Sequence, residues 1–264
     1  MYKAFYGLKY EVFPKDIRPS NIFMYESLQE LFARLDYMKN YRGIMLLSGD
    51  PGTGKTTALR CFVDQLSQEH FMPVYIPLST VAIGDFYKQI NDSLNGEPRS
   101  SKSVLFKSIQ ERILHYAIQL KKIPVIIIDE AHLLKNENFF ELQIISNFKM
   151  DSMDPALFIL IAQSHLNDRL ARAFLNSFNQ RINMKFHVNP LSLRETEEYI
   201  KHHLKIAGGS TEILDENALK TVFNLSNGIN RNIGKLVIKT LTLGTKLKKQ
   251  ILTEEEVLAA SKEL

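Results

Sequence analysis

The stretch GIMLLSGDPGTGKT, residues 43–56, decides the fold of this chain. Its first half is a short apolar run that predicts a buried β-strand ending at Ser48. Its second half, residues 49–56, has the spacing Gly-x-x-x-x-Gly-Lys-Thr, and a helix is expected from Lys55 to about Gln68. A glycine loop between a strand and a helix lets backbone N–H groups and the helix N-terminus surround phosphate groups. The pattern therefore predicts a phosphate-binding loop.

Each position of this loop has an expected role toward a nucleoside triphosphate. Lys55 would reach the β- and γ-phosphates, and the hydroxyl group of Thr56 would bind Mg²⁺. We therefore predict ATP and Mg²⁺ as cofactors; a chance glycine turn is the alternative, and the flanking elements argue against it. The expected nucleotide contacts are Asp50, Pro51, Gly52, Thr53, Gly54, Lys55, Thr56 and Thr57.

A second motif, PVIIIDE at residues 124–130, combines a buried strand with two carboxylates. Asp129 at the strand end would be a ligand of the Mg²⁺ ion. Glu130 would orient and polarise the attacking water. A chance acidic pair after a strand is the alternative, but its position downstream of a glycine loop favours hydrolysis. We therefore predict a slow, switch-like ATPase that releases ADP and phosphate.

Residues 129–132 also spell Asp-Glu-Ala-His, the tetrapeptide of a helicase group. We reject that interpretation, because such helicases need a second motor domain that the helical residues after Pro190 do not supply. His132 is expected to have a packing or signalling role. The adjacent His202 and His203 do not have the spacing of metal ligands, and a solvated helix face explains them better.

Three polar positions fall where an oligomeric ATPase would need them. Gln163 follows a predicted strand and could sense the γ-phosphate. Arg181 precedes the last strand and could reach the nucleotide of a neighbouring subunit, where an arginine is worth about 10³–10⁵ in rate. Arg231 opens a helix and could fold over the nucleotide in the same subunit. Arg169 and Arg172 are rivals for the role in trans, and for each position alone a surface or capping role is the default.

Strands alternate with helices up to Pro190, after which only helical patterns remain. We predict an α/β P-loop fold with a five-stranded parallel sheet between helices, followed by a small all-α lid domain. The domains are then residues 1–190, with an N-terminal arm at 1–25, and residues 191–264. The other expected strands are Met72–Leu78, Pro124–Asp129, Ala156–Ala162 and Ile182–Val188, and the clearest helices are Ser27–Asn40, Val104–Lys122 and Phe139–Lys149. Four helices are expected in the lid, three of them opened by Ser192, Asp215 and Thr253.

The composition is that of a soluble globular protein, with 45% apolar and 23% charged residues among 264. No apolar run approaches the roughly 18–20 residues of a membrane helix, and a single cysteine, Cys61, excludes an internal disulfide. We therefore expect a cytoplasmic protein without membrane contact. The net charge of +4 permits an anionic partner such as DNA without requiring one.

With these residues placed, the chain resembles the AAA+ superfamily, and more narrowly its ExeA/TniB/TnsC branch. The segments that carry the narrower resemblance are FYGLKYEVFP at 5–14, DEAHLL at 129–134, IAQS at 161–164 and NQRI at 179–182. Membership of the superfamily implies self-assembly, as a ring or a helical filament, with ATP at the subunit interfaces.

The branch contains two different activities, and the resemblance implies one of them. Its secretion ATPases carry a membrane anchor and a wall-binding domain, for which a chain ending at Leu264 has no room. We therefore expect a transposition helper that assembles on double-stranded DNA without sequence preference and recruits a transposase. The alternatives are a secretion-type ATPase and a replication initiator or helicase loader. The expected DNA contacts are Arg99, Lys102 and Lys107, with a flexible solvated loop as the alternative.

Overall fold

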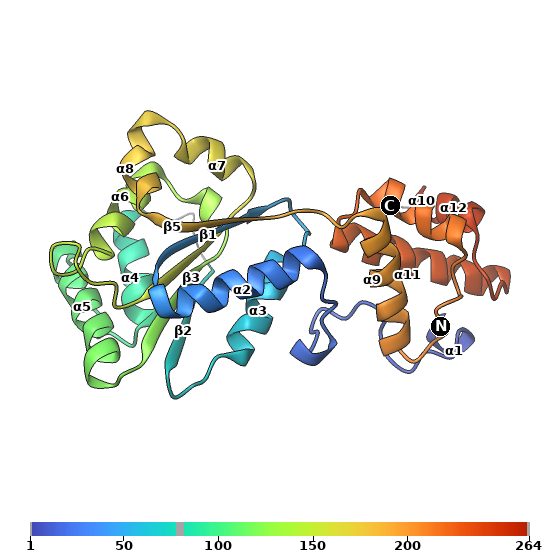
Figure 1. Cartoon of the computed structure of the whole chain (residues 1–264), viewed down its shortest axis with the longest axis horizontal. Coiled ribbons are helices and arrows are strands. Elements are labelled where there is room, and N and C mark those ends of the chain that lie inside the picture. The colour runs from blue at the N-terminus through green and yellow to red at the C-terminus, as the bar shows by residue number, and fades with distance from the viewer. Residues whose placement is uncertain (1, 78–81, 263–264) are drawn as a thin grey trace. The chain divides into compact units, whose positions relative to one another are not determined.

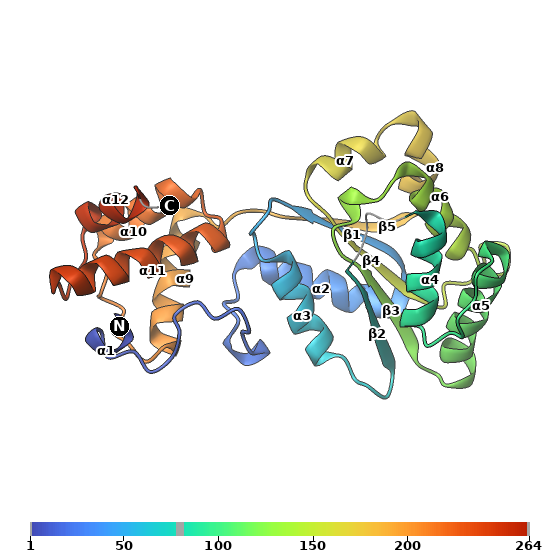
Figure 2. The ribbon, with the colours of Figure 1, turned by 180° about the vertical axis from the view of Figure 1, so that it is seen from behind.

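The computed structural model describes residues 2–77 and 82–262, and their contacts form two compact units. The first unit, the sheet unit, is Leu28–Gly49 with Ala58–Val188. The second, the helical unit, is Met1–Ser27, Asp50–Thr57 and Asn189–Leu264. Figures 1 and 2 show the elements of both units from opposite sides. The phosphate-binding loop is thus grouped with the helical unit by its contacts.

Five strands, paired in parallel throughout, form the sheet in the order β2-β3-β4-β1-β5. The strands are β1 Gly43–Gly49, β2 Phe71–Ile76, β3 Ile123–Ile128, β4 Leu157–Ile161 and β5 Ile182–Val188. Every residue of β1 is buried between β4 and β5. The predicted five-stranded parallel sheet is confirmed. Leu78, expected at the end of the second strand, lies outside the described residues.

Helices cover both faces of the sheet, which explains why its strands are continuous apolar runs. Alternate strand residues such as Leu46, Ile126 and Phe158 join one buried cluster with helices α4, α5 and α6. Helices α2 and α3 cover the opposite face (Figures 1 and 2). These helices are α2 Glu26–Tyr41, α3 Lys55–Gln65, α4 Ile83–Ser93, α5 Lys102–Leu114 and α6 Asn136–Ile145.

Several helices depart from the sequence expectation. The long helix expected up to Lys122 ends as α5 at Leu114 and continues as a π-helical turn, His115–Gln119. The helix expected up to Lys149 ends as α6 at Ile145, and residues 149–151 have positive φ angles that a right-handed helix excludes. Helices α4, α7 (His165–Leu170) and α8 (Asn176–Gln180) were not predicted.

The helical unit contains the four predicted lid helices, three of which begin after the expected capping residues. They are α9 Leu193–Ile206, α10 Glu216–Ser226, α11 Asn230–Leu247 and α12 Glu254–Ser261. Ser192 and Thr253 each form a capping box with the glutamate three residues later, and the Asp215 side chain accepts from the N–H of Ala218. Among the described residues, no helix has both the length and the apolar character needed to cross a membrane.

The N-terminal arm packs on the helices of the helical unit. The backbone N–H groups of Lys9 and Tyr10 donate to the carbonyl oxygen of Ala207, at 2.8 and 3.2 Å. The Tyr6 hydroxyl donates to the carbonyl of Lys249 at 2.9 Å. Burial of the aromatic side chains of the arm gives this docking its apolar contribution.

His203 contradicts the expectation of a solvated helix face. Its side chain is buried, and Nδ1 donates to the carbonyl oxygen of Val12 at 2.9 Å. Its ring lies 4.7 Å from that of Phe13 and 4.4 Å from that of Tyr199, measured between centroids. Burial, together with the neighbouring His202, lowers the pKa of His203 from 6.5 to about 4. The ring is therefore neutral near pH 7, and it ties the arm to α9.

We expect His203 to make the helical unit sensitive to acid. Because its folded pKa lies below the unfolded value, protonation favours the unfolded chain. Its contribution is complete above pH 6.5 and is lost as the pH falls toward 4. The expected loss in the free energy of unfolding is about 2 kcal/mol between pH 7.5 and 5. Denaturant unfolding of the full chain at both pH values measures it.

His203→Asn is the control, because its amide keeps an N–H donor for Val12 and does not titrate. The variant should lose less free energy of unfolding than the wild type between the two pH values. Equal losses would show that His203 does not cause the acid sensitivity.

Candidate active site

The phosphate-binding loop has the backbone geometry that its glycines allow. Gly52 has φ +92°, and a Cβ atom there would lie 2.9 Å from the Cβ of Arg231. Thr53 is fully buried, and its hydroxyl donates to the carbonyl oxygen of Asp50 at 2.9 Å. The Lys55 ammonium donates to the same oxygen at 2.8 Å. The loop therefore closes on itself around Asp50 and needs glycine at 52.

Arg231, the expected lid arginine, lies beside this loop. Its backbone N–H donates to the carbonyl oxygen of Gly52 at 3.1 Å, so the first turn of α11 touches the loop directly. The close approach at Gly52 is what permits this contact. Within the helical unit, the loop and the lid arginine are thus brought together.

The residue types at the loop suit ATP and Mg²⁺. Lys55 is only 9% exposed, a setting in which a cation favours an anionic neighbour. Thr56 and Thr57 lie in the first turn of α3, where the positive end of the helix dipole favours an anionic group. The Thr56 hydroxyl and the Asp129 carboxylate are the oxygen donors that Mg²⁺ prefers.

Strand register places Asp129 and Gln163 at the same edge of the sheet as the start of the loop. Ile128 pairs with Leu160, and Leu47 pairs with Ile161. Gly49 and Gln163 therefore leave the sheet at the same level, and Asp129 follows β3 one strand further on. With strands about 4.8 Å apart, this edge brings β1, β4 and β3 within about 10 Å.

Both carboxylate oxygens of Asp129 are held by donors within the sheet unit. Oδ1 accepts from the backbone N–H of Glu130 at 2.8 Å, and Oδ2 accepts from the Tyr75 hydroxyl at 2.9 Å. Burial and the hydrogen bond to Asp129 raise the pKa of Tyr75 to about 12. Tyr75, at the end of β2, was not predicted. Its only signal was an aromatic residue near a strand end, which packing explains equally well.

Glu130 occupies a strained backbone position. Its φ and ψ are 51° and 36°, in the left-handed region that non-glycine residues rarely adopt. The chain turns here from β3 into a short 3₁₀ helix, Ala131–Leu133. The turn leaves the Glu130 side chain 55% exposed, and one carboxylate oxygen lies 3.4 Å from Nδ1 of His132. Strain of this kind concentrates at functional sites.

The side chains of His132 and Arg169 stabilise this turn. His132 is buried and meets the His165 ring edge-to-face, with 5.0 Å between centroids. Arg169 donates to the backbone carbonyls of His132, at 2.9 Å, and of Leu134. Burial lowers the pKa of its guanidinium, which also lies 5.0 Å from the centre of the Phe139 ring. Arg169, a rival for the trans role, thus makes structural contacts within the sheet unit.

Arg181 lies at the opposite edge of the sheet from Asp129 and Gln163. It directly precedes β5, whose first residue, Ile182, pairs with Ile44 near the start of β1. At about 3.3 Å per residue, the length of β1 separates the two edges by roughly 20 Å. The structure therefore does not bring Arg181 to the carboxylates of its own sheet.

The expected DNA contacts have different surroundings. Arg99 forms an ion pair with Glu97, and Lys107 is 77% exposed and lies 3.8 Å from Glu111. The Lys102 ammonium lies 2.5 Å from a carboxylate oxygen of Glu141, whose other oxygen accepts from the Tyr87 hydroxyl. All three side chains are at the surface, but the ammonium of Lys102 pairs with a largely buried carboxylate.

A family model described as an AAA domain matches residues 38–170. The General secretion pathway protein A of Aeromonas hydrophila is 31% identical over 244 residues, which are 91% of this chain and 44% of that protein. This chain therefore spans less than half of that relative.

Two solved structures share the fold at low identity. The Aeropyrum pernix ORC2 protein, in ADPNP-ADP complexes, has a TM-score of 0.68 at 14% identity, covering 96% of this chain and 71% of that one. The Aeropyrum pernix ORC1 protein in complex with DNA has a TM-score of 0.66 at 14% identity, covering 97% and 69%. The predicted AAA+ fold is confirmed.

Glycine at position 130 should stabilise the fold relative to alanine. Glycine adopts positive φ without penalty, whereas alanine keeps the Cβ atom that strains this turn. We expect Glu130→Gly to exceed Glu130→Ala by about 1 kcal/mol in the free energy of unfolding, measured by denaturant titration.

The same pair of substitutions at Glu111, an exposed residue of α5, is the control. There the order should reverse, because glycine weakens a helix by up to about 1 kcal/mol relative to alanine. An alanine variant at 130 as stable as the glycine variant would mean that the turn is not strained.

Proposed function

Since the chain belongs to the AAA domain family of P-loop ATPases, we propose that it is an ATP-dependent assembly switch with nucleotide at its subunit interfaces. The position of Arg181 carries this proposal. Arg181 precedes β5 at one edge of the sheet, whereas Asp129 follows β3 at the other. An arginine so placed serves the nucleotide of a neighbouring subunit, not its own. The contacts that Arg169 makes with the turn after β3 support Arg181 over this rival.

Each site residue then has one task. The loop at 50–57 holds the phosphates, with Lys55 on the β- and γ-phosphates and Arg231 covering the nucleotide from the same subunit. Thr56 and Asp129 hold Mg²⁺, which when bound neutralises charge on the phosphates. Glu130 orients and polarises the attacking water, and Gln163 senses the γ-phosphate. ATP favours assembly, and hydrolysis favours release.

We propose double-stranded DNA as the surface on which the subunits assemble, and transposition as the process that they regulate. A net charge of +4 and the exposed side chains of Arg99 and Lys107 support a phosphate-backbone partner. The fold is shared with an ORC1 protein in complex with DNA. The transposase partner and a cytoplasmic site of action rest on the resemblance to TniB- and TnsC-type proteins.

A second function, that of a secretion-type ATPase, is favoured by a different observation. The sequence match to General secretion pathway protein A covers 91% of this chain. In that case the assembled ATPase would act on a secretion apparatus and would not need DNA. A role as a replication initiator or helicase loader is a third candidate, supported by the fold alone.

Subunit mixing tests the trans arrangement. Lys55→Ala removes phosphate binding but keeps Arg181, and Arg181→Ala does the reverse, so each variant alone should have little ATPase activity. An equal mixture should regain up to about a quarter of the wild-type rate, because a quarter of randomly formed interfaces combine an intact site with an intact arginine. A mixture no more active than the separate variants would argue against action in trans.

Imaging with a slowly hydrolysed ATP analogue, with and without duplex DNA, tests the choice of partner. We expect assemblies on DNA that form only with nucleotide, and Glu130→Gln assemblies that persist in ATP because hydrolysis is blocked. Lys107→Glu should weaken binding and flatten its salt dependence. Lys88→Glu, on the exposed side of α4, is the matched control. Nucleotide-dependent assembly that ignores DNA would instead favour the secretion-type function.

A further inference from the structure

The turn after α6 is held in an unusual backbone conformation. Lys149, Met150 and Asp151 have φ angles of 47°, 54° and 65°, three successive left-handed residues without a glycine. The turn is fixed by side chains: Asn147 accepts from the N–H of Asp151 at 3.0 Å, and the Ser152 hydroxyl donates to the carbonyl of Lys149 at 2.7 Å. Backbone strain that surrounding contacts maintain is typical of positions with a functional constraint.

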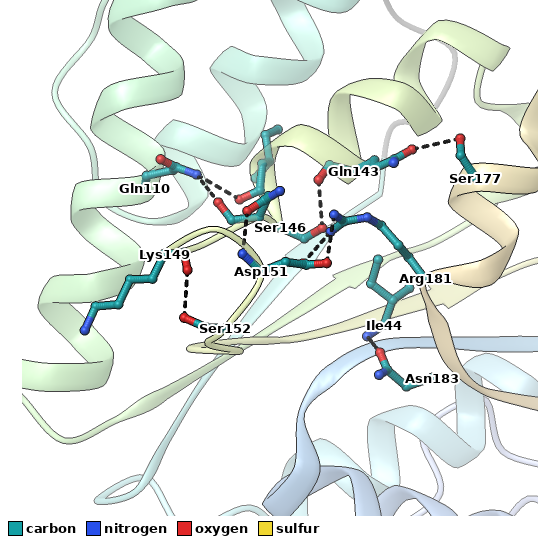
Figure 3. Close-up of polar contacts among 12 residues, drawn as sticks. Ile44, Gln110, Gln143, Ser146, Lys149, Asp151, Ser152, Ser177, Arg181 and Asn183 are labelled. Atoms are coloured by element: carbon teal, nitrogen blue, oxygen red, sulfur yellow. Dashed lines mark hydrogen bonds and ion pairs between the residues drawn. The ribbon is translucent and has the colours of Figure 1, made fainter.

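What the turn achieves is the placement of one carboxylate. The two oxygens of Asp151 lie 2.9 and 3.1 Å from the two terminal nitrogens of Arg181 (Figure 3). This end-on, bidentate pairing fixes the guanidinium plane. The Arg181 side chain is only 23% exposed, whereas that of Asp151 is 59% exposed. The carboxylate therefore covers the end of the arginine from the solvent side.

The arginine lies beside a surface groove. Phe106, Phe140 and Ile144 line this groove together with Arg181, and the last two apolar side chains are 37% and 50% exposed. Asp151 contacts both terminal nitrogens of Arg181. A phosphate that approached the end of the guanidinium would compete with Asp151 for these two N–H groups.

We propose that Asp151 is the positioning residue of Arg181: it holds the guanidinium in the unassembled chain and releases it when a neighbour's γ-phosphate takes its place. This inference rests on the proposed role of Arg181 in trans. An exposed ion pair is weak, while a multiply charged phosphate in a dry interface binds the guanidinium more strongly. Exchange therefore accompanies assembly. Before assembly, Asp151 keeps the arginine from other anions, including DNA phosphates.

ATPase turnover as a function of protein concentration tests this inference on the full chain. Asp151→Asn removes the charge, and asparagine tolerates the left-handed conformation of position 151. We expect its half-saturating protein concentration to fall about two- to fivefold, with maximal turnover unchanged. The reason is that the ion pair between residue 151 and Arg181 no longer competes with assembly. A thermal melt checks that the variant is folded.

Asp64→Asn is the matched control, because Asp64 is an exposed carboxyl of α3 outside the pair with Arg181. It should leave the half-saturating concentration unchanged. An Asp151→Asn variant with no shift in this concentration, or with reduced maximal turnover, would overturn the positioning role of Asp151. The proposed role of Arg181 in trans would still stand. Wild-type turnover by Arg181→Ala would instead overturn the role of Arg181, and with it this inference.

Discussion

The parallel pairing of β1 between β4 and β5 is the constraint on which the rest of this structure depends. Every residue of β1 is buried, so the strand needs neighbours on both sides and helices on both faces. Because all five strands run in one direction, their carboxyl ends meet at one edge. That edge receives the start of the phosphate-binding loop, Asp129 and Gln163. The opposite edge receives Arg181, and this separation divides the polar residues into two sets that one subunit does not combine.

The loop itself links nucleotide binding to the helical unit. Gly52 allows the first turn of α11 to approach so closely that the N–H of Arg231 donates to the loop backbone. A group bound by the loop therefore lies next to the start of α11, within the same compact unit. The arm stabilises this unit through apolar contacts and through the buried, neutral His203. The helical unit therefore consists of the four lid helices together with the N-terminal arm.

Several side chains of the proposed site are fixed by hydrogen bonds made inside the chain. Tyr75 and a backbone N–H orient both oxygens of Asp129, and a left-handed backbone turns Glu130 outward. Asp151 holds Arg181 in a fixed plane. Such preorganisation lowers the entropy lost when a ligand or subunit binds. Each of these contacts lies within the sheet unit, whose strands supply the rigid support.

The glycine loop, the carboxylates after a buried strand, the parallel sheet and the four helices of the lid, three of them capped, could be predicted from the sequence alone. These follow from local spacing, because a strand, a glycine turn and a capping box each depend on residues close in the chain. Only the tertiary structure decided that His203 is buried, that Tyr75 reaches Asp129 and that Asp151 pairs with Arg181. These partners are 191, 54 and 30 residues apart in the chain. No local pattern encodes such contacts, since they exist only once strand order and helix packing have brought the segments together.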